Sequence, residues 1–266
     1  MARSRKKRKT KKGGNNPLIR KFDTKLDLQN NFGEMLVKSI KEDFDLLETD
    51  FGPIKISDGA VVYSLKNKGA FVPIASIRDR VSDDDYLEIL LEYERLNQEF
   101  PGEPFINVQI ADCYKHLNEE EKYAQRLKEN FSKYKGDPLV DIQYTMNLDQ
   151  ITLEIYESIF DPARTNIHEQ YPTFKAFDPY TVTEFYALKT KHHIALKEYE
   201  VAQKCVAIVQ QIDVKKARLL SAMVLYATDP AFRRKAKWTR FIVTLVVLAI
   251  IGGVIWGLIT LLRWIF

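Results

Sequence analysis

The sequence has few of the residues on which disulfide-rich domains and metal sites depend. Its 266 residues include 2 cysteines and 4 histidines. Cys113 and Cys205 fall in different predicted helices and form no CxxC spacing, so neither a disulfide framework nor a zinc site is predicted. We expect both to be small buried residues in a protein that faces a reducing cytosol.

The sequence also lacks the short motifs that identify common enzymes. It contains no HExxH, GxSxG, P-loop or Rossmann glycine pattern. The adjacent His192 and His193 would project about 100° apart on a helix, which makes them a poor pair of metal ligands. We therefore predict no catalytic, cofactor-binding or metal-binding residues and no cofactor. An enzyme with an unrecognised active site is kept as the third hypothesis.

One long segment has no charged residue. It covers the 22 residues from Phe241 to Leu262, and as a helix it would be about 33 Å long, which matches the roughly 30 Å hydrocarbon core of a bilayer. We predict one transmembrane helix there, with Trp238 and Trp264 at the two membrane interfaces. Gly253 and Gly257 form a GxxxG pattern that could mediate helix dimerisation. Glycines that are merely tolerated in a membrane helix explain the same pattern equally well.

Basic residues flank this segment unequally, and the more basic side of a span stays in the cytosol. Only Arg263 follows the span, whereas five basic residues precede it: Arg233, Arg234, Lys235, Lys237 and Arg240. We expect a single-pass, C-tail-anchored protein whose body faces the cytosol, and the sequence does not indicate which membrane holds it. Asp229-Pro230 is typical of a helix start, so we predict one helix from Pro230 to near the C-terminus.

The first twelve residues lack both acidic residues and an apolar run, so we expect no secretory signal peptide. We predict a disordered basic tail over residues 1–16. Its candidate contacts with anionic lipid or nucleic acid are Arg3, Arg5, Lys6, Lys7, Arg8, Lys9, Lys11 and Lys12, joined by the five basic residues before the span. Between the two basic segments, residues 13–232 contain 26 Lys and Arg against 36 Asp and Glu. An acidic body is therefore held between two basic ends.

Residues 17–81 are predicted to form a helix followed by a small β-meander. Apolar residues recur at helical spacing within 27–52. After Gly52-Pro53 the chain becomes rich in β-branched residues, and Asp58-Gly59 is typical of a tight hairpin turn. A third strand is expected beyond Gly69, with Pro73 marking an edge strand.

Residues 82–229 are predicted to be helical throughout. Proline and glycine breaks at "FPGEP", "KGDP" and "FDPA" separate the helices. Ser82 is expected to cap the first helix, and three consecutive aspartates after it cannot converge on one metal ion. The expected helices are 83–99, 104–117, 119–135, 138–160, 182–196, 199–212 and 214–227.

Two of these segments resemble a known repeat family. "IADCYKHLNEEEKYAQRL" contains Ala111, Tyr114 and Ala124, and "KTKHHIALKEYEVAQKCV" contains Tyr199 and Ala202. Both look like tetratricopeptide (TPR) repeats, in which small residues permit close helix packing. The two units are further apart in the sequence than two periods of about 34 residues, so the helix pair between them is expected to be degenerate. The resemblance implies a mainly α, TPR-like α-solenoid that binds a peptide or protein on its concave surface, and it implies no reaction.

We therefore expect four parts: a tail (1–16), a helix with a β-meander (17–81), TPR-like repeats (82–229) and a juxtamembrane segment with its span (230–266). The leading hypothesis is a membrane-tethered adaptor or scaffold that holds a protein partner. The alternative is a membrane tether for RNA or ribosomes that uses the basic tail. Expected partners are thus a protein, the bilayer, anionic lipid or RNA, and a second copy through the transmembrane helix.

Overall fold

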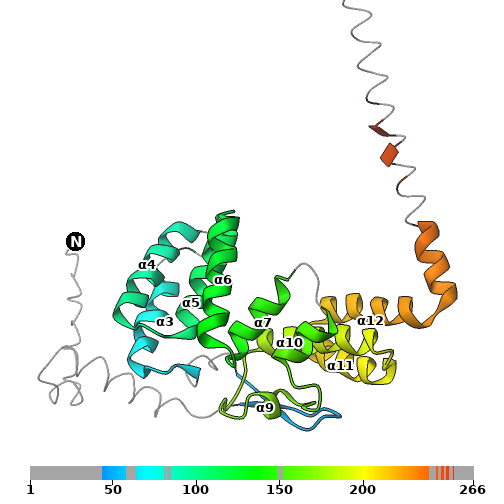
Figure 1. The fold of residues 1–266 in the computed structure, drawn as a ribbon, viewed down its shortest axis with the longest axis horizontal. Helices are drawn as coiled ribbons and strands as arrows, with labels where there is room; N and C mark the ends of the chain where they lie inside the picture. The colour runs from blue at the N-terminus through cyan, green and yellow to red at the C-terminus, as the bar shows by residue number, and fades with distance from the viewer. Residues whose placement is uncertain are drawn as a thin grey trace, which may run out of the picture.

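The computed structural model describes residues 44–57, 64–80, 82, 85–148 and 152–239, together with six positions between 244 and 254. Within these ranges the protein is mainly helical, as predicted, with one small antiparallel sheet (Figure 1). The helices follow one another as neighbours along the body. This order suits a chain whose apolar residues recur at helical spacing.

The sheet consists of β1 (Asp45–Leu47) and β2 (Ile54–Ile56) in antiparallel register. Ile56 also forms a parallel bridge with Phe177. The Ser57 N–H donates to the Phe177 carbonyl at 3.0 Å, and the Phe177 N–H donates to the Lys55 carbonyl at 3.1 Å. A segment about 120 residues further along the chain thus completes the hydrogen bonding of β2.

The sheet corrects two predictions. Asp45–Leu47 is a strand and not the end of a helix. The predicted β-meander has no third strand beyond Gly69, because that part of the chain forms the short 3₁₀ helix η2 (Lys68–Ala70) and then α3 (Phe71–Arg80). Pro73 lies in the first turn of α3, where its missing N–H costs no hydrogen bond. The predicted Asp58-Gly59 turn lies outside the described residues.

The next helices are α4 (Tyr86–Glu99), α5 (Pro104–His116) and α6 (Glu120–Tyr134), each packed against its predecessor. Ile74 and Ile77 of α3 share one buried cluster with apolar residues of α4 and α5. The cap of α4 is Asp85, whose side chain accepts the Glu88 N–H at 3.1 Å. Ser82 contributes only its backbone carbonyl, which accepts the Asp85 N–H, so the predicted Ser82 side-chain cap is wrong.

The central helices are α7 (Pro138–Met146), α8 (Leu153–Ile159) and the single turn α9 (Ile167–Gln170). The predicted continuous helix 138–160 is therefore divided. Thr152 caps α8 by accepting the Ile155 N–H at 3.2 Å, which gives α8 its own start. The segment from Phe160 to Asp178, which is irregular apart from α9, then connects to the last group of helices.

That group comprises α10 (Pro179–Ala195), α11 (Tyr199–Ile212) and α12 (Val214–Thr228). The bounds of α11 match the prediction. Tyr186 of α10 and Cys205 of α11 are both fully buried in the largest cluster, which also includes Tyr156 of α8 and Ile54 of β2. The small sheet therefore packs on the same core as the C-terminal helices.

Two types of turn recur between the helices. Gly102 and Gly136, 34 residues apart, both adopt positive φ just before a helix that begins with proline. Asn118 and Lys197, 79 residues apart, are the two non-glycine residues with positive φ in the described ranges. Each is the middle residue of a three-residue turn between successive helices. The helix pairs α5/α6 and α10/α11 are thus joined by equivalent turns.

The chain leaves the body through one further helix, residues 230–239, which directly follows α12. Asp229 caps it by accepting the Ala231 N–H at 2.7 Å, and Pro230 is its first residue, as predicted. Figure 1 shows this segment turning steeply away from α12, on the side opposite α11.

Among the residues that the structure describes, no helix has both the length and the apolar character needed to span a bilayer. The predicted span 241–262 falls mostly outside those residues and stays a prediction. Also outside them are the basic tail from Arg3 to Lys12, Arg240, Gly253, Gly257 and Trp264.

Candidate functional site

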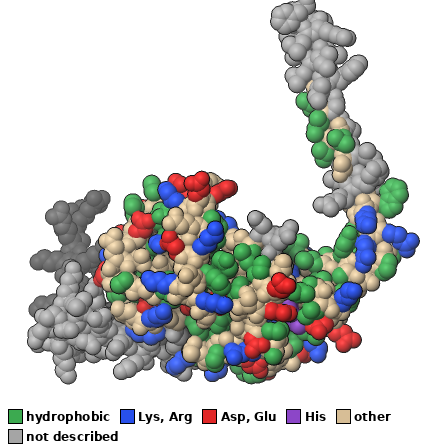
Figure 2. Space-filling view, in the orientation of Figure 1, with side chains coloured by type: hydrophobic (Ala, Val, Ile, Leu, Met, Phe, Trp, Pro, Cys, Tyr) green, Lys and Arg blue, Asp and Glu red, His purple; other side chains and the backbone are tan. Residues whose placement is uncertain are grey.

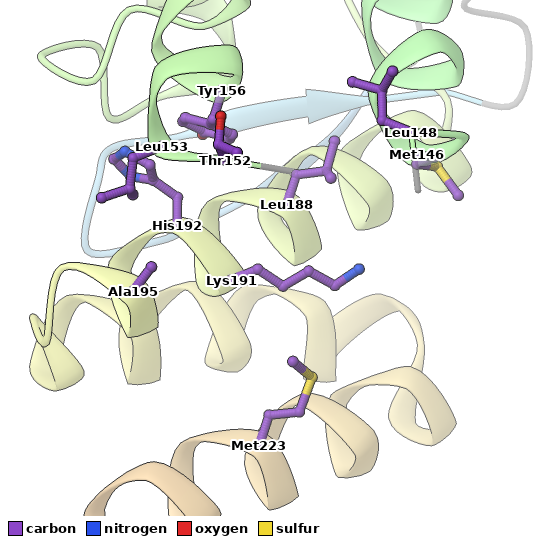
Figure 3. Close-up of a pocket in the computed structure, with 10 residues that line it drawn as sticks. All are labelled: Met146, Leu148, Thr152, Leu153, Tyr156, Leu188, Lys191, His192, Ala195 and Met223. Carbon is purple, nitrogen blue, oxygen red and sulfur yellow. The ribbon is translucent and has the colours of Figure 1, made fainter. Parts of the chain in front are cut away.

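A groove opens between α7, α8, α10 and α12. It has a volume of about 350 Å³ and is lined by Met146, Leu148, Thr152, Leu153, Tyr156, Leu188, Lys191, His192, Ala195 and Met223. Figure 3 shows α10 crossing its centre, the ends of α7 and α8 on one side, and Met223 of α12 on the other. We refer to it as the α10 groove.

The lining is mostly apolar. Met146 and Met223 lie on opposite sides, and flexible methionine side chains let a binding surface adapt to different apolar groups. Lys191 is exposed and is the one formally charged residue among the described residues that line the groove. In Figure 3 its side chain lies between those of Leu188 and Met223. The groove therefore combines apolar surface with one positive charge.

His192 adds a polar group to one end of the groove. It is 4% exposed, stacks on Tyr156 with ring centroids 4.2 Å apart, and its Nε2 lies 3.2 Å from a carboxylate oxygen of Glu157. Its buried Nδ1 has no hydrogen-bond partner among the described residues. A buried polar atom without a partner is costly unless a bound molecule or water satisfies it. This atom is consistent with a ligand in the groove.

A second hollow of about 280 Å³ lies between α5, α7 and the start of α10. Its wall includes Tyr180, whose hydroxyl lies 4.0 Å from the sulfur of Met146 in the α10 groove. Asp112 also lines it and accepts a 2.7 Å hydrogen bond from Gln143. Burial raises the pKa of Asp112 above its ordinary value. The Tyr180–Met146 contact places the two hollows next to each other.

The residues predicted to give TPR-like packing differ in burial. Ala111 and Ala202 are fully buried, Tyr114 and Tyr199 are half-buried, and Ala124 is exposed. When the two helix pairs are aligned on their equivalent turns at Asn118 and Lys197, Ala202 occupies the position of Tyr123, 79 residues earlier. Tyr123 is half-buried, so it faces the neighbouring helix where Ala124 was expected to do so.

The predicted basic contacts near the membrane fall into two groups. Arg234, Lys235 and Lys237 are exposed on the 230–239 helix, and Trp238 is 65% exposed. Arg233 instead donates to the carbonyls of Tyr226 at 3.0 Å and Ala227 at 2.8 Å. It therefore satisfies carbonyl groups at the C-terminal end of α12 and is less available to lipid.

The cysteines are buried, as predicted, and are free thiols. Burial raises the pKa of Cys113 to about 11 and that of Cys205 to about 12. Thiols in this state are poor nucleophiles and poor metal ligands. Within the described part of the chain, no group of three or more His, Cys, Asp and Glu residues could hold a metal ion.

The α10 groove was not predicted from the sequence. A signal was present on α10, where Leu188, Lys191, His192 and Ala195 recur at helical spacing and share one face. That face becomes part of a groove only when the ends of α7 and α8 and the side of α12 are added. Comparison with protein-family models, with curated proteins and with solved structures gave no match.

Proposed function

We propose that this protein is a membrane-tethered adaptor that binds a segment of a partner protein in the α10 groove. The observation that carries the proposal is the composition of that groove, in which Lys191 is the one formally charged residue among the described lining and lies among mostly apolar side chains. The partner segment is a peptide with two or three apolar side chains and an acidic residue that faces Lys191. A groove of about 350 Å³ is within the range of ligand sites, roughly 300 to 1,000 Å³.

The arrangement of the helices supports a repeat scaffold. Turns at Gly102 and Gly136 recur after 34 residues, and the α5/α6 and α10/α11 pairs share one turn geometry. We propose that these pairs are TPR-like units. The intervening pair α7/α8 departs from the pattern because α8 is only 7 residues long and a long irregular segment follows it. An adaptor of this type needs a binding surface and no catalytic group.

The C-terminal region supports the tether. Beyond the basic 230–239 helix, five described positions are apolar and 47–61% exposed: Val247, Leu248, Ile250, Ile251 and Val254. Such surface is unfavourable in water and favourable in lipid. We propose that residues 241–262 span a membrane and leave the body on its cytosolic side. A tether raises the local concentration of partners in the same membrane.

Selection from a random dodecapeptide library on the full-length protein in detergent tests the binding surface. We expect enriched peptides to combine apolar residues with Asp or Glu. In K191E the preference should change toward Lys or Arg, because the charge in the groove is reversed.

K128E is the matched control, since Lys128 is exposed on α6 outside the lining of the α10 groove. It should select the same peptides as the original protein. Identical enrichment for K191E and the original protein, or no enrichment by either, would contradict the proposed peptide-binding role.

A further inference from the structure

The outer face of α12 has an unusual composition for the last helix of a stacked body. Ala217, Leu220 and Val224 are buried against the preceding helices. The opposite face is apolar and basic, and it consists of Val214, Lys215, Arg218, Leu219, Leu225 and Tyr226. We refer to these residues as the outer α12 face. Terminal helices of repeat proteins normally present a polar outer face to water.

The exposure of this face is large. Leu219 is 69% exposed, Val214 is 50% exposed and Leu225 is 45% exposed. No other described element packs over these three residues to cover them. Several large apolar side chains together on one helix face indicate a surface that is covered in use.

The charge around this face has one sign. Between 214 and 239 the chain has seven Lys and Arg residues, and Asp229 is the single acidic residue. Lys216 pairs with Glu184, and Arg233 bonds to backbone carbonyls. The others are exposed: Lys215, Arg218, Arg234, Lys235 and Lys237. Figure 2 shows Lys, Arg and hydrophobic side chains along the segment where the chain leaves the body.

We propose that the outer α12 face lies against the headgroup layer of a bilayer that contains anionic lipid. The proposal rests on the membrane tether of the proposed function. An amphipathic helix with apolar and basic residues on one face binds the interface of anionic membranes. A protein partner or a second copy would have to supply a matching acidic and apolar surface, whereas an anionic bilayer offers both features.

The geometry of the chain end agrees with this placement. Residues 230–239 rise from the side of α12 opposite α11 (Figure 1), the side on which the outer α12 face lies. If Trp238 sits at the membrane interface, Pro230 lies about 12 Å below it when the helix is upright, and side chains on α12 reach about 5 to 6 Å back toward the membrane. The remaining distance of about 6 Å is comparable to one headgroup layer, roughly 5 to 8 Å.

A site-specific fluorophore tests the proposal in the full-length chain. The native cysteines are buried, so an NBD label can be attached at L219C. The labelled protein is reconstituted into vesicles of phosphatidylcholine and phosphatidylglycerol that carry a headgroup spin label. The control is L46C, because Leu46 is also exposed, at 55%, but lies in β1 on the far side of the body from the C-terminal segment (Figure 1).

We expect the spin label to quench NBD at position 219 at least about twofold more than at position 46, because cations hold α12 at the surface. High salt, which screens these charges, should reduce the difference. Adding K215E/R218E to the labelled L219C protein should remove the difference in quenching, although the protein stays anchored in the vesicles.

Equal quenching at both positions would overturn the proposal. So would protection of the label at 219 from aqueous iodide without quenching by the lipid spin label, since that pattern indicates a covering protein. If the chain does not float with vesicles at all, the membrane tether fails as well. Flotation without quenching at 219 removes only the role of α12.

Discussion

Asp141 is a buried carboxylate whose replacement should change how stability depends on pH. It lies on α7, is 1% exposed, and accepts the Gly136 N–H with both oxygens at 3.1 and 3.2 Å. The hydroxyl of Tyr171 donates to it at 3.2 Å. Burial is the largest effect and raises the pKa of Asp141 from 3.8 to about 6.

The direction of the pH effect follows from proton binding. Between pH 4 and pH 6 the folded chain holds a proton on Asp141 that the unfolded chain has lost, so the free energy of unfolding falls as pH rises through this range. With pKa values of 3.8 and about 6, one such group lowers the stability by about 1.4 kcal/mol between pH 5 and pH 8.

D141N removes the titration and keeps an acceptor for the Gly136 N–H. We expect its free energy of unfolding to fall less between pH 5 and pH 8 than that of the original protein, by about 1.4 kcal/mol. Urea unfolding followed by far-UV circular dichroism, on the full-length chain in detergent at both pH values, measures this difference. The neighbouring Asp137, whose pKa burial also raises to about 6, should keep part of the slope in the variant.

D45N is the control, since Asp45 is exposed on β1. Its pH dependence should match that of the original protein. If D141N retained the full decrease between pH 5 and pH 8, Asp141 would be ionised at both pH values in the folded chain, and the reasoning from burial would be wrong.

Two further predictions concern backbone geometry. R233A should destabilise the junction after α12 by about 1 kcal/mol, because it removes a charged donor to two backbone carbonyls. We expect faster amide hydrogen exchange that is confined to residues 225–239. Unchanged exchange would contradict this role of Arg233. K197G should stabilise the chain by up to about 1 kcal/mol, because lysine at φ 63° is strained and glycine is not. N118G should gain less, since asparagine tolerates positive φ, and the two melting temperatures should rank accordingly; a larger gain for N118G would argue against strain at Lys197.

The helical body shows how far local signals reach. Helix α11 was predicted with its observed bounds because Tyr199 to Ile212 has a continuous apolar face between two turns. The breaks at Gly102 and Gly136 were predicted from glycine and proline alone, and both glycines adopt positive φ. These features depend on residues within one or two helical turns, and such residues are adjacent in the sequence.

The N-terminal sheet shows where local signals fail. Asp45–Leu47 has the apolar residues of a helix end, yet it pairs with Ile54–Ile56. That strand in turn bonds to Phe177 across more than 100 residues. Hydrogen bonds to distant partners produce no repeating pattern in the sequence of a strand. The long-range pairing therefore outweighed the local helical propensity of Asp45–Leu47.

Local sequence patterns were enough to predict the helical class of the body, most helix boundaries between 99 and 229, the buried cysteines, and the basic, apolar character of the C-terminal end. Four features became apparent only in the folded chain: the α10 groove, the equivalent positions of Ala202 and Tyr123, the role of Arg233 and the uncovered face of α12. Helices form from interactions between residues three or four positions apart. A groove or an exposed face depends on which helices lie side by side, and that is decided by packing across the whole chain.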